Sequence, residues 1–211
     1  MAPNPSPARK AAVALLTRVL AEARPLSEPG SVLDGLEPAD RAAAQRLAAD
    51  TLRGLERVDR LLKPHLRKPP GLRVMNVLRL GAFELAQGGA AHGIVNDCVS
   101  LVAMNKRTIG FKGLVNAVLR KLAEDAPDRY AALRVPRLPK WLRGPLVDAW
   151  GAQAVAAIEG AHFAGAPLDL TAKATPEAVA QATGGEMLPT GSVRLREAAQ
   201  VSALPGFATG D

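Results

Sequence analysis

Apolar residues recur at three- and four-residue spacing through most of the first 130 residues, which is typical of helices with one buried face. In the first such segment, Ala12, Leu15, Leu16 and Val19 share a face. The predicted helices span residues 8–22, 38–55, 58–62, 72–87, 94–104 and 111–122. The breaks between them are short, so this part of the chain is predicted to form a compact helical bundle.

Proline and glycine set the limits of these helices. Pro38 suits the first turn of the second helix, where its missing N–H has no helical partner to lose. We expect the chain to turn near Arg57, Gly88-Gly89 to stop the helix that starts at 72, and the last helix to fade at Pro127. The first 130 residues are therefore predicted to be all-helical.

A helical connector follows at residues 139–160. Leu142, Leu146 and Trp150 fall on one of its faces. Both tryptophans, Trp141 and Trp150, are therefore expected to be packing residues rather than stacking platforms for a ligand.

The hydrophobic period then changes to two, which predicts strands at residues 168–173 and 193–196. Between them, Thr175 can cap a helix that Pro176 opens and Gly184-Gly185 closes. A β-α-β unit of about 45 residues is too small to bury its sheet face unaided. The predicted fold class is mainly α: a helical bundle, a helical connector and a small, incomplete α/β subdomain.

Composition supports a helical core and excludes several classes of protein. Hydrophobic residues make up 48% of the 211-residue chain, enough for a core, but aromatic residues only 3%, so the core must consist mainly of Leu, Val and Ala. Cys98, the single cysteine, cannot form an internal disulfide. No signal peptide and no apolar run of about 18 residues is present, so we expect a cytoplasmic protein without membrane contact.

The formal net charge of +7 is concentrated in the first part of the chain. Residues 1–130 hold 20 basic and 13 acidic side chains, whereas residues 131–211 hold seven of each. Residues 53–79 carry eight cations against two acids, and residues 106–121 carry five cations and no acid. Such clusters can neutralise phosphates and so indicate a nucleic-acid binder, although a cationic helix face is often only a solvated face.

No catalytic, cofactor or metal site is evident. The segment Gly110–Gly113 lacks the spacing and the Lys-Ser/Thr ending of a phosphate-binding loop, and no glycine-rich cofactor loop follows a strand. His65, His92 and His162 are scattered and are expected to be surface or capping residues rather than metal ligands. Cys98 lies on the apolar face of its helix and is predicted to be a small core residue. Catalysis by this chain alone is not expected.

Several motifs resemble the NusB-like RNA-binding fold. They are VMNVLRLGAFEL at 74–85, IVND at 94–97, FKGLVNAVLR at 111–120, and, in the earlier helices, DR at 40–41 and TLRG at 51–54. The KGLVNAVLR version, followed by PKWL at 139–142, is more similar to the Sun (Fmu) family of 16S ribosomal RNA 5-methylcytosine methyltransferases. The resemblance runs along the whole chain, and the motifs are stronger together than singly.

The resemblance implies a division into three parts. Residues 1–130 would be the NusB-like RNA-binding domain, 131–164 the connector, and 165–211 a partial α/β subdomain leading to a methyltransferase domain. In that family the last domain binds S-adenosylmethionine and uses two cysteines, and Cys98 matches neither of them. Residues 204–207, LPGF, look like the entry to that domain. The expectation is therefore an amino-terminal portion of such an enzyme, with S-adenosylmethionine needed only by the full-length parent.

What remains in such a portion is recognition of 16S ribosomal RNA. Because aromatic residues are few, recognition is expected to use phosphate contacts and RNA shape rather than base stacking. The candidate RNA-binding residues are Arg9, Lys10, Lys106, Arg107 and Lys112.

Two other functions remain open from the sequence. The first is a NusB-like protein-interaction module in transcription antitermination or ribosome assembly, with a ribosomal protein as partner, since helical bundles readily present grooves. The second is a purely structural bundle that folds against another domain. Arg9 and Lys10, near a proline-rich start, can also be simply solvated.

Overall fold

The computed structural model describes residues 5–173, 175–195, 201–208 and 210. They form two compact units, Met1–Glu159 and Gly160–Asp211. The three-part division expected from the resemblance stays a prediction. Arg196, expected to continue the last strand, lies outside the described residues.

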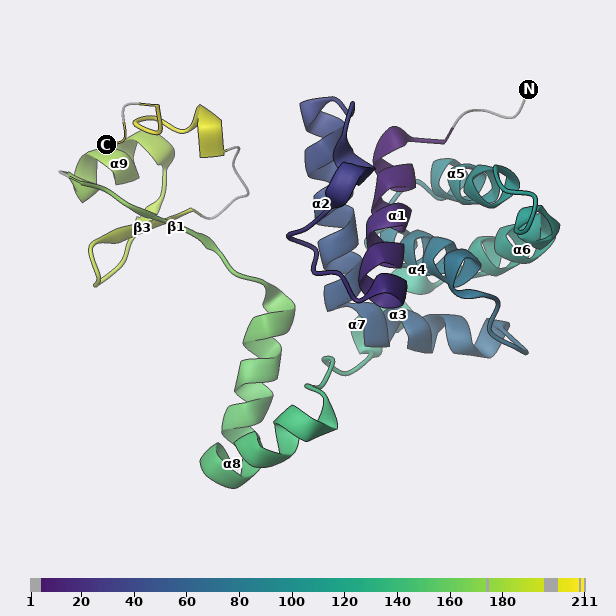
Figure 1. Ribbon diagram of the computed structural model, residues 1–211. Coiled ribbons are helices and arrows are strands. Elements are labelled where there is room, and N and C mark those ends of the chain that lie inside the picture. The colour runs from purple at the N-terminus through teal and green to yellow at the C-terminus, as the bar shows by residue number, and fades with distance from the viewer. Residues whose placement is uncertain (1–4, 174, 196–200, 209, 211) are drawn as a thin grey trace. The chain divides into compact units, whose positions relative to one another are not determined.

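The first unit consists of helices joined by loops of different lengths, of which the loop from α1 to α2, residues 23–37, is long (Figure 1). Its bundle elements are α1 (Pro7–Glu22), η1 (Gly30–Leu33), α2 (Pro38–Arg53), α3 (Leu55–Leu62), η2 (Lys63–His65), α4 (Leu72–Ala86), α5 (Ala91–Ala103), η3 (Ile109–Phe111), α6 (Lys112–Leu122) and α7 (Ala126–Ala132). The expected helices are confirmed, but the break after the second falls at Gly54 rather than near Arg57. Pro127 does not end the bundle: it occupies the first turn of α7, where the missing N–H costs nothing.

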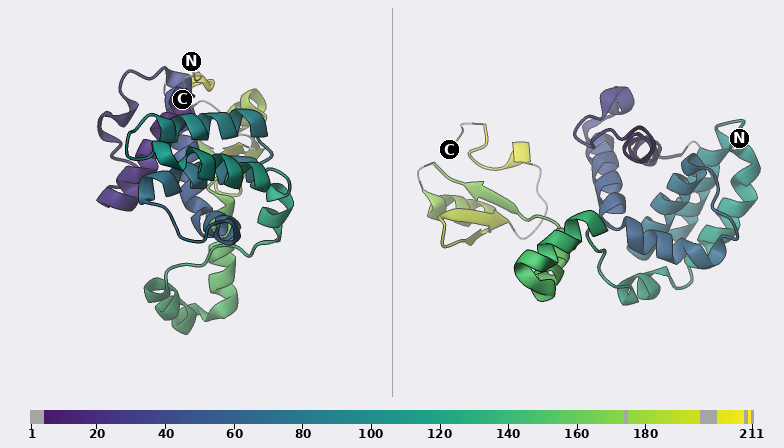
Figure 2. Two further views of the ribbon diagram at one scale, coloured as in Figure 1. Left: turned by 90° about the vertical axis from the view of Figure 1, so that its right-hand side faces the viewer. Right: turned by 60° about the horizontal axis from the view of Figure 1, so that its bottom comes forward.

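Helix α4 is the centre of this bundle. It contacts α1, α2, α3, α5, α6 and α7, and ten of its 15 residues are buried. The views from two sides place α5 and α6 next to each other beyond α4 (Figures 1 and 2). A helix buried on most of its surface removes much apolar area from water, and α4 is the one that touches the other helices of the bundle, while α1 with α2 and α5 with α6 also pack directly on each other.

Gly81 allows α4 to approach α5 and α6 closely. A Cβ atom at this position would lie 2.7 Å from Leu119 Cδ1 and 2.9 Å from Cys98 Sγ. Leu119 and Cys98 are themselves fully buried, so neither side chain has space to move away. The prediction that Cys98 is a small core residue is confirmed.

A buried arginine joins α3 to α7. The Arg57 guanidinium lies 4.3 Å from the centre of the Tyr130 ring, and its Nη2 donates to the backbone oxygens of Ala131 and Leu133. Tyr130 also packs edge-on against Phe83 of α4, with ring centres 6.4 Å apart. The cation–π contact and the carbonyl acceptors together compensate for burying a charge.

A chain of polar side chains links α1, α4 and α3. Asn76 is fully buried; its Nδ2 donates to Thr17 Oγ1 at 3.2 Å and its Oδ1 accepts from Arg79 Nη1 at 3.1 Å. Arg79 in turn donates twice to Asp59, at 2.8 Å each. Both ends of the buried Asn76 amide thus have a partner, which fixes how far α4 is rotated against its neighbours.

The connector is helix α8 (Lys140–Ala164), which is kinked at Gly151, where φ is 80°. The segment before α8 is held by Glu159, which accepts hydrogen bonds from the Leu138 N–H and from Arg143 Nε at 2.9 Å each. Burial of Glu159 disfavours its charged form, but these hydrogen bonds outweigh that effect and lower its pKa. The connector is thereby tied to itself by a charged, buried side chain.

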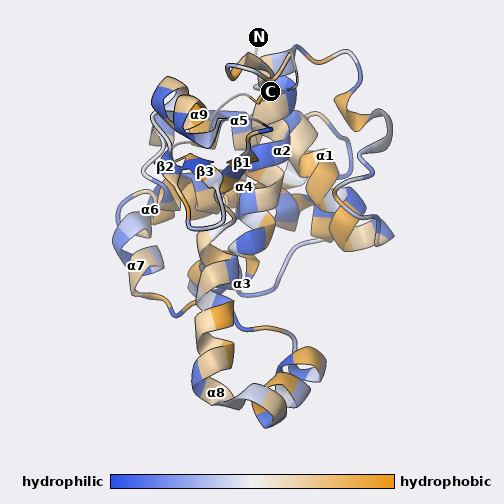
Figure 3. Ribbon diagram, turned by 90° about the vertical axis from the view of Figure 1, so that its left-hand side faces the viewer, coloured by the Kyte–Doolittle hydropathy of each residue, from blue (hydrophilic) through white to orange (hydrophobic). Residues whose placement is uncertain are grey.

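The prediction that both tryptophans pack is wrong. Trp141 is 76% and Trp150 71% exposed within the described chain. The buried residues of α8 are Val155 and Glu159, beyond the kink, whereas the half that carries the tryptophans meets no other described element closely. Hydrophobic residues also remain along α8 in Figure 3, coloured orange.

The second unit contains β1 (Leu168–Thr171), α9 (Pro176–Thr183), β2 (Glu186–Met187), β3 (Ser192–Leu195) and η4 (Val201–Ala203). The two predicted strands and the helix between them are confirmed, but β1 pairs with β3 in an antiparallel direction, and the short β2 makes the sheet order β1-β3-β2. The sequence predicted the order of strand, helix and strand but not the direction in which the two strands pair, which is antiparallel. The two residues of β2, Glu186 and Met187, are both exposed, and so short a strand has no alternating apolar pattern that the sequence could reveal.

The ends of α9 follow the sequence closely. Pro176 is its first residue and Gly184, with φ of 66°, ends it. The side chain of Thr175 makes no capping hydrogen bond, so that part of the prediction is wrong. Across the sheet, Arg194 donates to both oxygens of Asp169 at 2.8 Å.

Replacement of Gly81 by valine tests the packing around α4. We expect Gly81→Val to lower the free energy of unfolding by about 1–3 kcal/mol, because the added carbons overlap buried side chains. The measurement is urea denaturation followed by circular dichroism. Gly93 in α5 is the matched control: open space surrounds it, and Gly93→Ala should be neutral or stabilise by up to about 1 kcal/mol through helix propensity. Equal stability of the two variants would contradict the close contact at Gly81.

Candidate nucleic-acid interface

Three of the five predicted RNA-binding residues gather where α5 passes into α6. Lys106 and Arg107 lie in the turn after α5, and Lys112 is the first residue of α6, directly after η3. All three side chains are exposed, and none pairs with a carboxylate in the described part of the chain. We call these three residues the basic turn.

The backbone of the basic turn is held in place by two hydrogen bonds, one buried and one exposed. The buried Thr108 donates its hydroxyl to the Val102 carbonyl at 2.7 Å, and the Arg107 N–H donates to Asn105 Oδ1 at 2.8 Å. An anchored turn presents its cations without ordering the backbone when a ligand binds, which lowers the entropy cost of binding.

Lys112 has no role in stabilising its helix. It stands at the amino-terminal end of α6, where the helix dipole is positive, and the first turn of α6 holds no acidic residue. A cation there opposes the dipole. An anionic ligand at this point would interact favourably with the lysine and with the positive end of the helix dipole.

Arg9 occupies a different environment. Its Nε and Nη2 donate to the two carboxylate oxygens of Glu84 at 2.8 Å each, and its Nη1 donates to Asp97 at 2.7 Å. Asp97 also accepts the Ser6 backbone N–H at 3.1 Å. These bonds, chiefly the one from Glu84, raise the pKa of Arg9 although burial acts in the opposite direction. The structure therefore places Arg9 in a link between α1, α4 and α5; its RNA contact stays a prediction.

Lys10, the next residue, is exposed and lines a pocket of about 390 Å³. Helix α1 contributes one stripe to this pocket, with Lys10, Val13, Ala14 and Thr17 at helical spacing. The sequence pattern alone could not reveal this stripe. It combines a buried apolar residue, Val13, with an exposed charged one, Lys10, so it coincides with neither the apolar nor the polar face of the helix.

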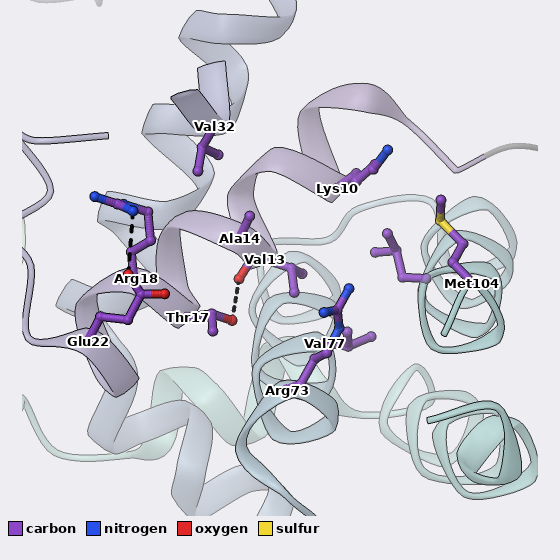
Figure 4. Close-up of a pocket in the computed structure, with 11 residues that line it drawn as sticks. Lys10, Val13, Ala14, Thr17, Arg18, Glu22, Val32, Arg73, Val77 and Met104 are labelled. Atoms are coloured by element: carbon purple, nitrogen blue, oxygen red, sulfur yellow. Dashed lines mark hydrogen bonds and ion pairs between the residues drawn. The ribbon is translucent and has the colours of Figure 1, made fainter. Parts of the chain in front are cut away.

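The opposite wall of the pocket brings in cations that sequence reasoning missed. Arg73 and Val77 from α4, together with Met104 at the end of α5, face the α1 stripe (Figure 4). Arg18 and Glu22 lie at the other end of the pocket, where they form an ion pair at 3.4 Å. Arg73 was part of a cation-rich segment, but nothing in that segment distinguished it from its neighbours.

Cys98 cannot act as a nucleophile in this fold. It is fully buried, and its Sγ contacts the Val77 carbonyl at 3.8 Å. Burial, reinforced by the charge of Glu84, raises the pKa of the Cys98 thiol. A thiol held protonated and out of reach of solvent is inert.

No group of metal-ligating side chains occurs among the residues that the structure describes. His92 contacts Asn96, and His65 contacts Arg129. Burial and the charges of Arg129 and Lys121 lower the pKa of His65. Within the described chain, none of the helices combines the length and the apolar character needed to cross a membrane.

Alanine substitutions at Arg9 and at Lys10 test whether the ion pairs of Arg9 stabilise the fold. Arg9→Ala leaves the mostly buried Glu84 and Asp97 without their cation, so we expect the free energy of unfolding to fall by about 2 kcal/mol. Lys10→Ala removes an exposed charge and should stay within about 0.5 kcal/mol of the unmodified protein. Urea denaturation of both variants makes the comparison. An Arg9→Ala variant as stable as Lys10→Ala would show that the link does not support the fold.

Comparison with known proteins agrees with this architecture. The model of the NusB family matches residues 6–124. The chain is 42% identical over 114 residues, 53% of its length, to the ribosomal RNA small subunit methyltransferase B of Thermus thermophilus. It is 29% identical over 96% of its length to the enzyme of the same name from Xanthomonas campestris. The matches span 26% and 49% of these relatives, in line with the expected resemblance, and the chain belongs to the NusB family.

Proposed function

We propose that this chain is the RNA-binding region of a 16S ribosomal RNA methyltransferase and that the basic turn binds RNA phosphates. The observation that carries the proposal is the exposure of Lys106, Arg107 and Lys112 on an anchored turn, without intramolecular ion pairs among the described residues. The names of the two relatives support ribosomal RNA as the nucleic acid.

The contrast between the basic turn and other cations supports this choice of surface. Arg9, Arg57 and Arg79 donate hydrogen bonds to acceptors within the bundle. A cation already paired with a carboxylate releases few counterions from RNA, whereas an unpaired exposed one contributes fully. The turn is thus a part of the bundle whose cations are available for phosphate contacts.

Methyl transfer would be carried out by other parts of the parent enzyme. Methylation of carbon 5 of cytosine needs a thiolate that adds to the pyrimidine ring and so activates carbon 5, and Cys98 is buried with a raised pKa. S-adenosylmethionine would serve that parent rather than this chain. The proposal places the protein in the cytoplasm, where ribosomal RNA is found, and is compatible with a ribosomal protein as second partner.

Neutralising the basic turn tests the proposal. The full chain should bind a single-stranded fragment of 16S ribosomal RNA with an affinity that falls steeply with salt. For a Lys106→Ala, Arg107→Ala, Lys112→Ala variant, the slope of log K against log salt should decrease by about 2, since each phosphate contact to a single strand contributes about 0.7. Fluorescence anisotropy across a salt series measures both quantities.

The matched control removes the same charge elsewhere. Arg41, Arg46 and Lys63 are exposed cations of α2 and η2, and their triple alanine variant should retain most of the salt slope. If both variants lose the same slope, binding is a diffuse effect of net charge and the basic turn is not the site. If the chain does not bind the RNA, the proposed function fails.

Methylation by the chain itself can be measured directly. Incubation of the purified chain with unmethylated 16S ribosomal RNA and S-adenosylmethionine should produce no 5-methylcytosine above a protein-free blank, as read by mass spectrometry of nucleosides. A Cys98→Ala variant should behave identically. Turnover that the Cys98→Ala substitution abolishes would overturn the assignment of Cys98 to the core.

A further inference from the structure

The pocket between α1, α4, α5 and η1 has an apolar floor. Val13, Val77 and Leu101 line it and are largely buried, and Met104, which is half exposed, stands at one end. The hydroxyl of Thr17 already donates to the Val13 carbonyl at 2.8 Å and accepts from Asn76. The floor therefore offers apolar contacts and few free hydrogen-bonding groups. Such a surface binds a flat, weakly polar ligand better than a small ion.

The rim at the Met104 end is cationic. Lys10 and Arg73 are exposed and pair with no carboxylate in the described part of the chain, and Figure 4 shows both on the side of the pocket that faces Met104. At the far end Arg18 is engaged by Glu22 and by the Glu28 carbonyl at 3.3 Å. The pocket thus combines an apolar interior with two available positive charges at one mouth.

This combination matches one nucleotide of a single strand. A volume of about 390 Å³ is at the lower end of small-molecule sites and excludes a duplex. A base is flat and largely apolar on its faces, and it is flanked by two phosphates. Single-stranded RNA is commonly recognised through bases that have left the stack.

The basic turn begins close to the pocket in the chain. Met104 lines the mouth of the pocket, and Lys106 and Arg107 follow it in the chain. A strand whose phosphates contact the turn would therefore pass the side of the pocket that carries Lys10 and Arg73.

We propose that this pocket receives one unstacked base of single-stranded RNA, with the adjoining phosphates on Lys10 and Arg73. The base lies on Val13, Val77 and Met104 without an aromatic partner, since no lining residue is aromatic. This inference rests on the proposed function and gives the RNA-binding surface a site for a base in addition to phosphate contacts.

A fluorescent base tests the site. The probe is an adenosine pentaribonucleotide with 2-aminopurine in the central position, whose fluorescence is quenched by stacking and recovers when the base leaves the stack. On binding to the full chain, we expect its fluorescence to rise, because the pocket contains no ring on which the base could stack. Anisotropy of a 5′-labelled copy reports binding separately.

Two variants test the pocket in different ways, one by filling it and one by removing the charges at its rim. Ala14→Leu places three further carbon atoms in it and should abolish the fluorescence rise and weaken binding about tenfold, the loss of one base contact. Lys10→Ala with Arg73→Ala removes two exposed charges without altering the floor, and should reduce both affinity and the rise. The matched control is Ala42→Leu on the exposed side of α2, which should change neither; thermal unfolding checks that all variants fold.

The outcomes separate this site from the proposed function. A rise with the unmodified chain that Ala14→Leu abolishes and Ala42→Leu preserves supports the pocket. Binding without a rise, or with a rise that Ala14→Leu leaves intact, overturns the pocket while the basic turn stands. If neither the pentamer nor the longer 16S fragment binds, the proposed function and the pocket fail together.

Discussion

Burial of helix α4 is the constraint on which the rest of the structure depends. Six helices contact it, and its Gly81 lets α5 and α6 approach until side chains touch its backbone. A chain with 3% aromatic residues obtains its core from Leu, Val and Ala, whose smaller surfaces stabilise only when they are packed without gaps. The pocket and the basic turn lie at the borders of this packing, where α1, α4 and α5 no longer touch.

Burial also decides what each cation of this basic chain can do. Arg9 is held by Glu84 and Asp97, Arg57 by Tyr130 and two carbonyls, and Arg79 by Asp59. These arginines connect helices that are distant in the sequence. Cations without such partners, among them those of the basic turn and of the mouth of the pocket, keep their charge available to a polyanion.

The connector differs from the bundle helices in that its tryptophans are exposed rather than buried. Trp141 and Trp150 lie on a helix that contains Pro145 and is kinked at Gly151, and both side chains are largely exposed within the described chain. The relatives are at least twice as long as the matched segments. The tryptophans belong to the part of the chain whose surroundings the sequence pattern predicted least well.

The sequence by itself determined the helices of the bundle, the helix that Pro176 opens, and the burial of Cys98, because periodicity, proline and glycine act locally. It did not predict α7 or β2, since Pro127 ends one helix and begins the next equally well and β2 has no apolar alternation. Nor could it distinguish Arg9 from Lys10, or select Arg73. Which cation meets a carboxylate 75 residues away, and which faces a pocket, is decided only when the helices pack.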